Sequence, residues 1–267
     1  MRPLRRSAIA AFLVLATPVL GLALASGWWC ARALSLPAEL HGVGACVVAL
    51  LCTCLYALAG HRLLLWAAPL NEGPIAVGGA QEWRYQLYSL QYLFLFNSLI
   101  RSRVIPIPLM RVVYLALGAR LGAGSYSAGI IFDPIFVTIG ADTLVGEAAL
   151  LVPHVIEGGA LAHHRIVLGD GVTIGACAVV LAGARIGDGA IVAANSVVAK
   201  HTCIPAGEIW GGTPARRLRA RQDALYGLLD GQLHLLAGKR KACTTDASLT
   251  TAAPRKHGNV PKRSAGP

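Results

Sequence analysis

A period of six residues governs the sequence from Leu121 onward. Each unit begins with an aliphatic residue, has glycine or another small residue at its second position, and has a small residue at its fifth. The clearest units begin at Ile139, Ile174 and Ile186. The fifth position is serine, threonine, alanine or valine in eleven of twelve units, and Ile131 is the exception. A fixed short period means that successive turns stack and bury the same side chains on one another.

Three such units make one triangular coil, in which the aliphatic residue points inward from a flat face and the small residue fits a tight corner. The predicted fold class is therefore mainly β, a parallel β-helix over residues 119–213. Ser127 and Asp133 stand where this phase expects an aliphatic residue. The other predicted regions are two transmembrane helices (1–70), an interfacial or capping helical region (71–118), a C-terminal helix (214–238) and a disordered basic tail (239–267).

Two long apolar stretches precede the repeat, and together they predict a helical hairpin in a membrane. Residues 7–31 and 42–60 contain no charged side chain, and each is long enough to cross about 30 Å of hydrocarbon as a helix. The whole chain is 55% hydrophobic, which is unusual for a soluble enzyme.

The flanking charges predict the orientation of this hairpin. Arg2, Arg5 and Arg6 precede the first stretch and Arg62 ends the second, whereas only Arg32 lies between them. The positive-inside rule then places both ends in the cytoplasm, so we expect a multi-pass protein of the cytoplasmic membrane whose β-helix faces the cytoplasm. The alternative is a signal peptide with residues 23–25 as its cleavage site.

The net charge of +11 does not by itself indicate a nucleic-acid partner. Residues 71–237 carry twelve basic and eleven acidic side chains, so the excess lies beside the apolar stretches and in the last thirty residues. That distribution suits an anionic bilayer surface better than a phosphate backbone, and no nucleic-acid partner is expected. The seven cysteines contain no CxxC pair, which indicates a reducing compartment.

A third apolar region covers residues 82–116 and is rich in aromatic side chains. Six of the seventeen aromatic residues lie between Trp83 and Phe96, and Arg101, Arg103 and Arg111 follow them. This composition is typical of a helix at the membrane interface, and equally of a helix that caps the next domain. Pro106 and Pro108 are expected to end the helix.

The repeat resembles that of the hexapeptide-repeat acyltransferases, which form left-handed parallel β-helices and are usually trimers. The resemblance runs from about Leu121 to Leu218. With the segment Trp210-Gly-Gly-Thr-Pro-Ala215, the chain is also similar to the membrane-tethered C-terminal domains of some nonribosomal peptide synthetases. The resemblance implies a homotrimer that transfers an acyl group from acyl-CoA, most simply acetyl-CoA. The acceptor would be a hydroxyl or amine of a small molecule, glycan or peptide product.

The period breaks once, between Leu151 and Leu168. These residues are 17 positions apart where three intact units need 18, which predicts a loop that leaves the coil at roughly residues 157–167. Three of the eight histidines lie in this stretch, namely His154, His163 and His164. A histidine cluster at an interruption of a regular array is the strongest functional signal in the sequence.

Acyl transfer requires a base that removes a proton from the attacking acceptor, and histidine has a suitable pKa. The resemblance places the catalytic histidine just before the protruding loop, which is the position of His154. Glu157 could orient its ring, as the acid of a catalytic triad does. The plainer alternatives are a corner histidine bonded to the backbone and a solvated carboxylate. His163 and His164 are weaker candidates for acceptor binding or for contact with a neighbouring subunit, and His201 is expected to be structural.

The donor site is expected at the end of the repeat. By resemblance, small residues of the last coils, Ala193 and Ser196, would line the path of the pantetheine arm. Lys200, Arg216 and Arg217 would meet the phosphates of coenzyme A, which suits their chemistry. The alternative for the two arginines is a solvated face of the following helix.

Two other functions remain open at this point. The β-helix could be a non-catalytic trimeric scaffold on a membrane. It could also be a zinc-dependent carbonic anhydrase of the γ type, which needs three histidines converging across a subunit boundary. No histidine pair here has the five-residue offset of those enzymes, so no metal cofactor is expected.

Overall fold

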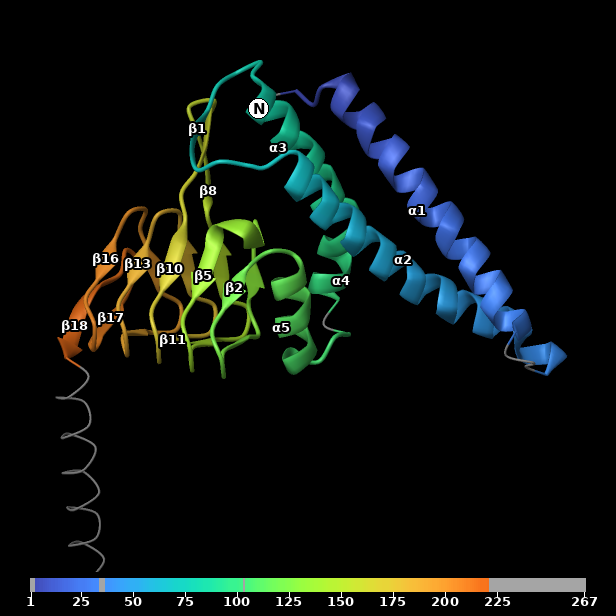
Figure 1. The fold of residues 1–267 in the computed structure, drawn as a ribbon. Coiled ribbons are helices and arrows are strands. Elements are labelled where there is room, and N and C mark those ends of the chain that lie inside the picture. Colours follow the sequence, from blue (N-terminus) through green and yellow to red (C-terminus); the bar gives the residue numbers. More distant parts are fainter. Residues whose placement is uncertain (1–2, 34–36, 103, 221–267) are drawn as a thin grey trace, which may run out of the picture. The chain divides into compact units, whose positions relative to one another are not determined.

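The computed structural model describes residues 3–33, 37–102 and 104–220. Two of its helices, α1 (Arg6–Ala33) and α2 (His41–Ala67), are long and apolar enough to cross a membrane. They lie against each other as a hairpin (Figure 1). Their outer surfaces expose large apolar side chains, among them Val14, Trp29 and Trp66.

Small residues let α1 and α2 approach closely. A Cβ atom on Gly27 would stand 2.5 Å from the carbonyl oxygen of Ala45 and 2.8 Å from Cβ of Ala49. Glycine is therefore required at this crossing, as in tightly packed membrane helices. Ser26 and Tyr56 add a hydrogen bond of 2.9 Å between the two helices.

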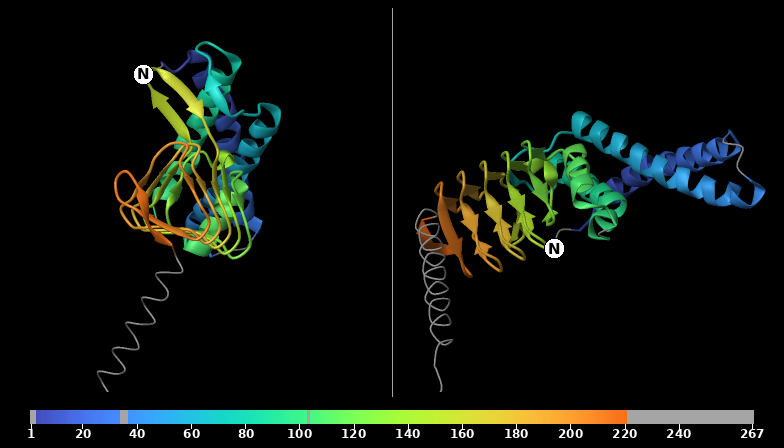
Figure 2. Two further views of the ribbon diagram at one scale, coloured as in Figure 1. Left: turned by 90° about the vertical axis from the view of Figure 1, so that its left-hand side faces the viewer. Right: turned by 90° about the horizontal axis from the view of Figure 1, so that it is seen from below.

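The repeat forms the predicted parallel β-helix, whose triangular coils are seen nearly end-on in the left view of Figure 2. Its three parallel sheets each collect one strand from successive coils. The first sheet contains β2 (Arg120–Leu121), β5 (Val137–Ile139), β10 (Ile166–Leu168), β13 (Arg185–Ile186) and β16 (Cys203–Ile204). The second contains β3 (Tyr126–Ser127), β6 (Leu144–Val145), β11 (Thr173–Ile174), β14 (Ile191–Val192) and β17 (Glu208–Gly211). The third contains β4 (Ile130–Ile131), β7 (Leu150–Val152), β12 (Val179–Leu181) and β15 (Val197–Val198).

The aliphatic column forms the core of these coils, and the fifth-position residues fill the corners. Ile174, Val180 and Val192 are fully buried, as are the corner residues Ala178 and Ala190. The fourth position, which the sequence pattern left unrestricted, takes a left-handed backbone conformation at the turns. It is often glycine but also holds non-glycine residues: Asp142, Ala148, Cys177, Asn195 and His201. The predicted structural role of His201 agrees with this position.

The phase of the first coil differs from the prediction. Ile131, not Asp133, is the inward residue of β4, because it pairs with Leu151 and is fully buried. The step from Ser127 to Ile131 takes four residues, and the step from Ile131 to Ile139 takes eight. Ile131 is large because it occupies the core and not a corner. Asp133 is thereby released from the core column into the turn that follows β4.

Different elements cover the two ends of the β-helix. Helix α5 (Ile107–Ala116) closes the first coil, where Tyr114 and the following Leu117 are fully buried. The hydroxyl of Tyr114 donates to the carbonyl oxygen of Gly129 and accepts from the N–H of Ile131. α5 thus covers this end of the β-helix. Pro106 and Pro108 begin this helix and do not end the preceding one, because proline is tolerated in a first helical turn.

The last coil is covered by a strand and not by the predicted helix over 214–238. β18 (Arg216–Ala220) pairs antiparallel with β17, with Gly211 opposite Arg216. The turn after Gly212 folds the chain back onto an edge whose N–H and C=O groups would otherwise lack partners. The remainder of that predicted helix and the predicted tail over 239–267 lie outside the described residues.

The interruption of the repeat is a β-hairpin that leaves the coil earlier than predicted. Its strands are β8 (His154–Glu157) and β9 (Ala160–His163), and the coil resumes at Ile166, within the range predicted as loop. A short upstream strand, β1 (Gly73–Ile75), pairs antiparallel with β9. Leu151 and Leu168 thus occupy corresponding inward positions of β7 and β10, and they are 17 positions apart because the hairpin is inserted between these strands.

A helical segment links β1 to α5 and packs between the hairpin and α1. It consists of α3 (Ala80–Gln91), a π-helical turn (Tyr92–Asn97) and α4 (Ser98–Arg101). Leu87 and Tyr88 are buried, and the ring of Tyr85 contacts His163 of the hairpin. This segment brings tyrosines to the corner from which the hairpin leaves the coil.

Candidate functional site

His154 and Asp133 meet where the hairpin leaves the coil. Because β4 and β7 are paired neighbours, the residues that follow them emerge on adjacent turns, about 5 Å apart. Nδ1 of His154 lies 2.6 Å from Oδ2 of Asp133. The backbone of Asp133 has a φ of 42° and starts a short helical turn (Pro134–Phe136). The displaced phase of the first coil therefore supplies the partner of the histidine.

The exposure of the pair is asymmetric. The Asp133 side chain is 7% exposed and that of His154 is 24% exposed. An ionised carboxylate only accepts hydrogen bonds, so Nδ1 carries a hydrogen and Nε2 presents a lone pair when the ring is neutral. The ring of Phe132 meets His154 edge-on at 5.9 Å and fixes its orientation from another side. A histidine held in this way has the orientation that general-base chemistry requires.

Buried tyrosines of α3 and the turn after it surround the carboxylate. Burial raises the pKa values of Tyr85, Tyr88 and Tyr92, and the negative charge of Asp133 raises them further. The hydroxyl of Tyr92 donates to the carbonyl oxygen of Ile131 at 3.0 Å. These phenols therefore remain protonated at neutral pH and form a dry wall beside the pair.

His163 is directly across the hairpin from His154, yet it is fully buried. Its ring stacks on Phe136 at 4.7 Å and meets Tyr85 edge-on at 4.6 Å, and neither ring nitrogen has a hydrogen-bond partner. Burial lowers its pKa to about 4, against a smaller opposite effect of Asp133. The ring of His163 is thus enclosed by aromatic side chains of its own chain, whereas that of His154 is partly open.

Glu157 and Lys200 pair with each other. Both carboxylate oxygens of Glu157 lie 2.5 Å from Nζ of Lys200, at the end of β8 away from His154. The predicted orienting role of Glu157 is thus wrong, since Asp133 holds Nδ1 of His154 instead. The predicted phosphate-binding role of Lys200 now requires that this exposed ion pair open. His164 lies at the base of the hairpin, where its ring packs against His201 at 4.6 Å.

The remaining predicted donor residues occupy the last coil, but Ser196 is unsuited to its role. It is fully buried, and its hydroxyl accepts a hydrogen bond from the N–H of Gly212. Ala193 is half-buried beside Gly211. Arg217 pairs with Glu208 at 2.7 Å. Arg216 is exposed, and no ion pair joins it to another described residue.

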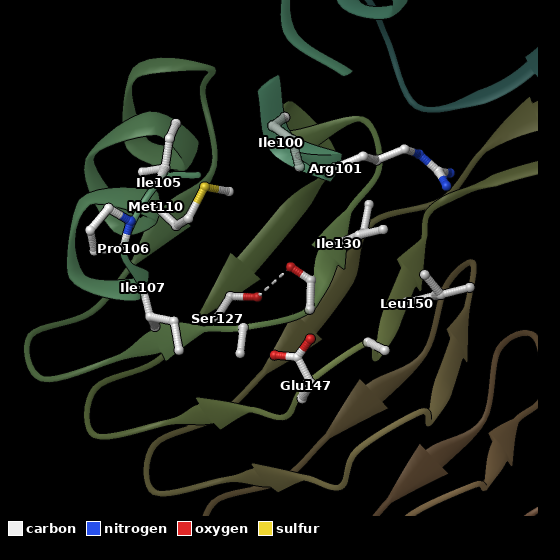
Figure 3. A pocket seen from close by; sticks show the side chains of 13 residues that line it. Ile100, Arg101, Ile105, Pro106, Ile107, Met110, Ser127, Ile130, Glu147 and Leu150 are labelled. Atoms are coloured by element: carbon white, nitrogen blue, oxygen red, sulfur yellow. Dashed lines mark hydrogen bonds between the residues drawn. The ribbon is translucent and has the colours of Figure 1, made fainter. Parts of the chain in front are cut away.

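A cavity of about 660 Å³ lies between the segment from α4 to α5 and the outer wall of the first coils, and neither His154 nor Asp133 is among the residues that line it. Figure 3 shows Glu147 at its floor, with Arg101 across from Pro106 and Ile107. The guanidinium of Arg101 lies 5.8 Å from the ring of Phe132, which in turn contacts His154. Among the described residues, no group of three or more histidine, cysteine, aspartate or glutamate side chains could hold a metal ion.

The sequence analysis did not include Asp133, Arg101 or Tyr85 in the site. One signal for Asp133 was present, because a charged residue stood in an aliphatic column directly before Pro134. The large Ile131 in the column of small residues marked the same irregularity. Arg101 and Tyr85 reach the site through packing of the helical segment, which no local pattern reveals.

Residues 165–200 match the family described as bacterial transferase hexapeptide (six repeats). A 2,3,4,5-tetrahydropyridine-2,6-dicarboxylate N-acetyltransferase of Staphylococcus aureus (strain bovine RF122 / ET3-1) is 36% identical over 104 residues, which are 39% of this chain and 40% of that protein. The mitochondrial gamma carbonic anhydrase 1 of Arabidopsis thaliana is 34% identical over 125 residues, covering 39% and 45% of the two chains. The chain thus spans about half or less of the length of these relatives.

A solved hexapeptide-repeat acetyltransferase of Vibrio cholerae is 30% identical and covers 40% of this chain and 64% of its own, with a TM-score of 0.37. The match over residues 165–200 agrees with the three parallel coiled sheets of the β-helix.

Proposed function

We propose that the protein is a membrane-anchored acyltransferase that moves an acyl group, most simply acetyl, from acyl-CoA to a hydroxyl or amine. The observation that carries this proposal is the hydrogen-bonded pair His154–Asp133 at the break in the repeat. The N-acetyltransferase relative, 36% identical over 104 residues, supports the same reaction class.

The pair accounts for the proton transfers of the reaction. Nε2 of His154 takes the proton of the acceptor hydroxyl or amine as that atom attacks the thioester carbonyl. Asp133 holds the ring and stabilises the imidazolium that results. When the tetrahedral intermediate collapses, the carbon–sulfur bond breaks and the imidazolium returns its proton to the CoA sulfur. Each proton removed is thus returned, and no covalent acyl-enzyme is needed.

The β-helix and the helical segment before it offer one surface for each substrate. The cavity of about 660 Å³ has a size suited to a small ligand and would take the polar part of the acceptor beside Arg101. Arg216, on the edge strand of the last coil, is the described cation best placed to meet a CoA phosphate, because Lys200 and Arg217 already pair with carboxylates. A trimer would bring a second chain to the outer walls.

The two apolar helices would anchor the enzyme in the cytoplasmic membrane. The arginines before α1 and at the end of α2 favour a cytoplasmic β-helix, which is the side where acyl-CoA is made. An anchored enzyme would act on acceptors held at, or made beside, that surface.

The test combines donor binding with acyl transfer by full-length protein in nanodiscs. Calorimetry follows acetyl-CoA binding, and thiol release follows transfer to a panel of amino sugars, amino acids and membrane lipid extract. We expect wild type to bind acetyl-CoA, and His154→Ala to retain that binding while transfer falls by about 10²-fold or more. His164→Ala is the matched control, because this histidine packs at the same corner without contacting Asp133.

Absence of acetyl-CoA binding by folded wild-type protein would overturn the proposal and favour a non-catalytic scaffold. Loss of transfer in His164→Ala but not in His154→Ala would move the base elsewhere. Stoichiometric zinc with carbon dioxide hydration would instead favour the activity named for the Arabidopsis relative.

A further inference from the structure

An apolar groove of about 480 Å³ runs between α3 and the hairpin that carries His154. The residues that line it come from three separate segments of the chain: Leu4, Glu82, Tyr85, Gln86, Ser89, Leu93, Ile156, Gly159 and Leu161. The few polar groups in its wall already have partners. Gln86 bonds to the backbone of Pro3 and Arg5, and Glu82 accepts from the N–H of Gly78. The surface left for an occupant is therefore mainly hydrocarbon.

The groove lies on the same face of the hairpin as the proposed base. Side chains two positions apart on a strand point to the same side, so His154 and Ile156 share one face of β8. Leu161 and His163 are their cross-strand partners on β9. Because Tyr85 of α3 contacts His163 and also lines the groove, this shared face is the one that α3 covers. Ile156 is about 7 Å along the strand from His154.

The other end of the groove leads to the first apolar helix. Leu4 is 52% exposed and lies two residues before the start of α1, and Leu93 is 50% exposed. Next to Leu93, the ring of Phe94 packs on Phe12 of α1 at 5.5 Å. Apolar side chains therefore follow one another from Phe12 of α1, past Leu93 and along the groove, to the hairpin face that bears His154.

We propose that this groove binds the hydrocarbon chain of an amphiphilic, lipid-linked acceptor, whose reactive hydroxyl or amine then lies at His154. The inference rests on the proposed acyltransferase function and names its substrate class. A chain that enters along α1 never has to leave an apolar environment, because the groove continues the surface that α1 exposes. An acceptor without such a chain would leave this apolar surface in contact with water.

The experiment uses full-length protein in nanodiscs of phosphatidylethanolamine and phosphatidylglycerol. Hexadecanol carrying a diazirine is added, irradiated, and located by peptide mass spectrometry. We expect labels in residues 85–93 and 156–161. Ile156→Glu and Leu93→Glu should each lower this labelling by about tenfold, because a charge does not remain buried against a hydrocarbon chain. Both side chains are at least half exposed, so the fold should persist, which thermal melting checks.

Val77→Glu is the matched control, since Val77 is an exposed apolar residue that does not line the groove. In this variant, residues 85–93 and 156–161 should be labelled to the same extent as in wild type. Labelling confined to α1 and α2, or equal labelling in all four proteins, would overturn the inference.

A second arm separates an acceptor chain from the acyl chain of a donor. Calorimetry compares acetyl-CoA and palmitoyl-CoA binding to wild type and Ile156→Glu. We expect both donors to bind the variant as they bind wild type. Selective loss of palmitoyl-CoA binding by Ile156→Glu would show that the groove binds the acyl chain of the donor, which would overturn the inference. If wild type is labelled in the groove yet binds neither donor, the groove stands and the proposed function fails.

Discussion

Asp133 and His154 are 21 positions apart in sequence but share a hydrogen bond of 2.6 Å, because they follow paired strands on neighbouring turns of the β-helix. The carboxylate is almost completely buried and the imidazole is partly open. One partner of the pair is thus enclosed by the protein, and the other is partly open to solvent. That division of roles allows the contribution of each residue to be measured separately.

Asp133→Asn should lower the rate of acyl transfer by about 10²-fold or more and leave acetyl-CoA binding unchanged. An amide can donate to Nδ1 and so stabilise the wrong tautomer, which removes the lone pair from Nε2. The measurement is thiol release at saturating acetyl-CoA, with the donor Kd from calorimetry. Asp142→Asn is the control, because Asp142 also has a left-handed backbone but lies at an ordinary corner. A rate in Asp133→Asn equal to that of the control would show that the hydrogen bond does not orient the base.

His163→Phe should make the stability of the protein less sensitive to acid. Its pKa is about 4 in the folded protein and near 6.5 when unfolded, so the unfolded chain binds the proton more readily between these values. The stabilising effect of keeping this ring neutral is full above pH 6.5 and is lost as the pH falls toward 4. The shift corresponds to a loss of about 3 kcal/mol at most.

Phenylalanine suits the site because Phe136 and Tyr85 already enclose the ring and its nitrogens lack partners. Chemical denaturation of both proteins at pH 7 and pH 4.5 gives the comparison. The difference in unfolding free energy between the two pH values should be smaller in the variant. An equal or larger difference would mean that His163 is not held neutral.

Glu157→Gln should leave acyl transfer within about twofold of wild type and change the free energy of unfolding by less than about 1 kcal/mol. The side chain is 63% exposed and pairs with Lys200 at the hairpin end, where solvent and salt weaken ion pairs. The measurement is the rate of acyl transfer by wild type and by Glu157→Gln, each at low and at high salt. A rate as low as that of Asp133→Asn would restore the orienting role that the sequence suggested for Glu157.

Local repetition made much of the fold predictable, and the site depends on departures from it. Residues such as Ile174 and Ala178 recur at fixed spacing, so their burial follows from the sequence alone. The step of four residues before Ile131 and the step of eight after it add up to two full periods, so the repeat continues in phase from Ile139. The six-residue period alone therefore could not show that Asp133 leaves the core and contacts His154.

Long-range packing explains the other differences. Leu218 fits a helical pattern, but its strand pairs with β17 because the last coil offers an unpaired edge. His163 looked available beside His164, yet Tyr85 from a distant helix buries it. Such contacts depend on how separate segments meet, and a one-dimensional pattern does not contain that information.

The orientation of the β-helix relative to the membrane can be tested with Cys203, which is exposed on the outer wall of the first sheet. A variant that retains only this cysteine is expressed in intact cells and treated with a membrane-impermeant maleimide. If both ends of the helical hairpin are cytoplasmic, Cys203 should react only after the cells are lysed. A second variant that retains only Cys177, on another turn, should behave in the same way. Labelling of either cysteine in intact cells would place the β-helix outside the cytoplasm, away from acyl-CoA, and would contradict the proposed donor.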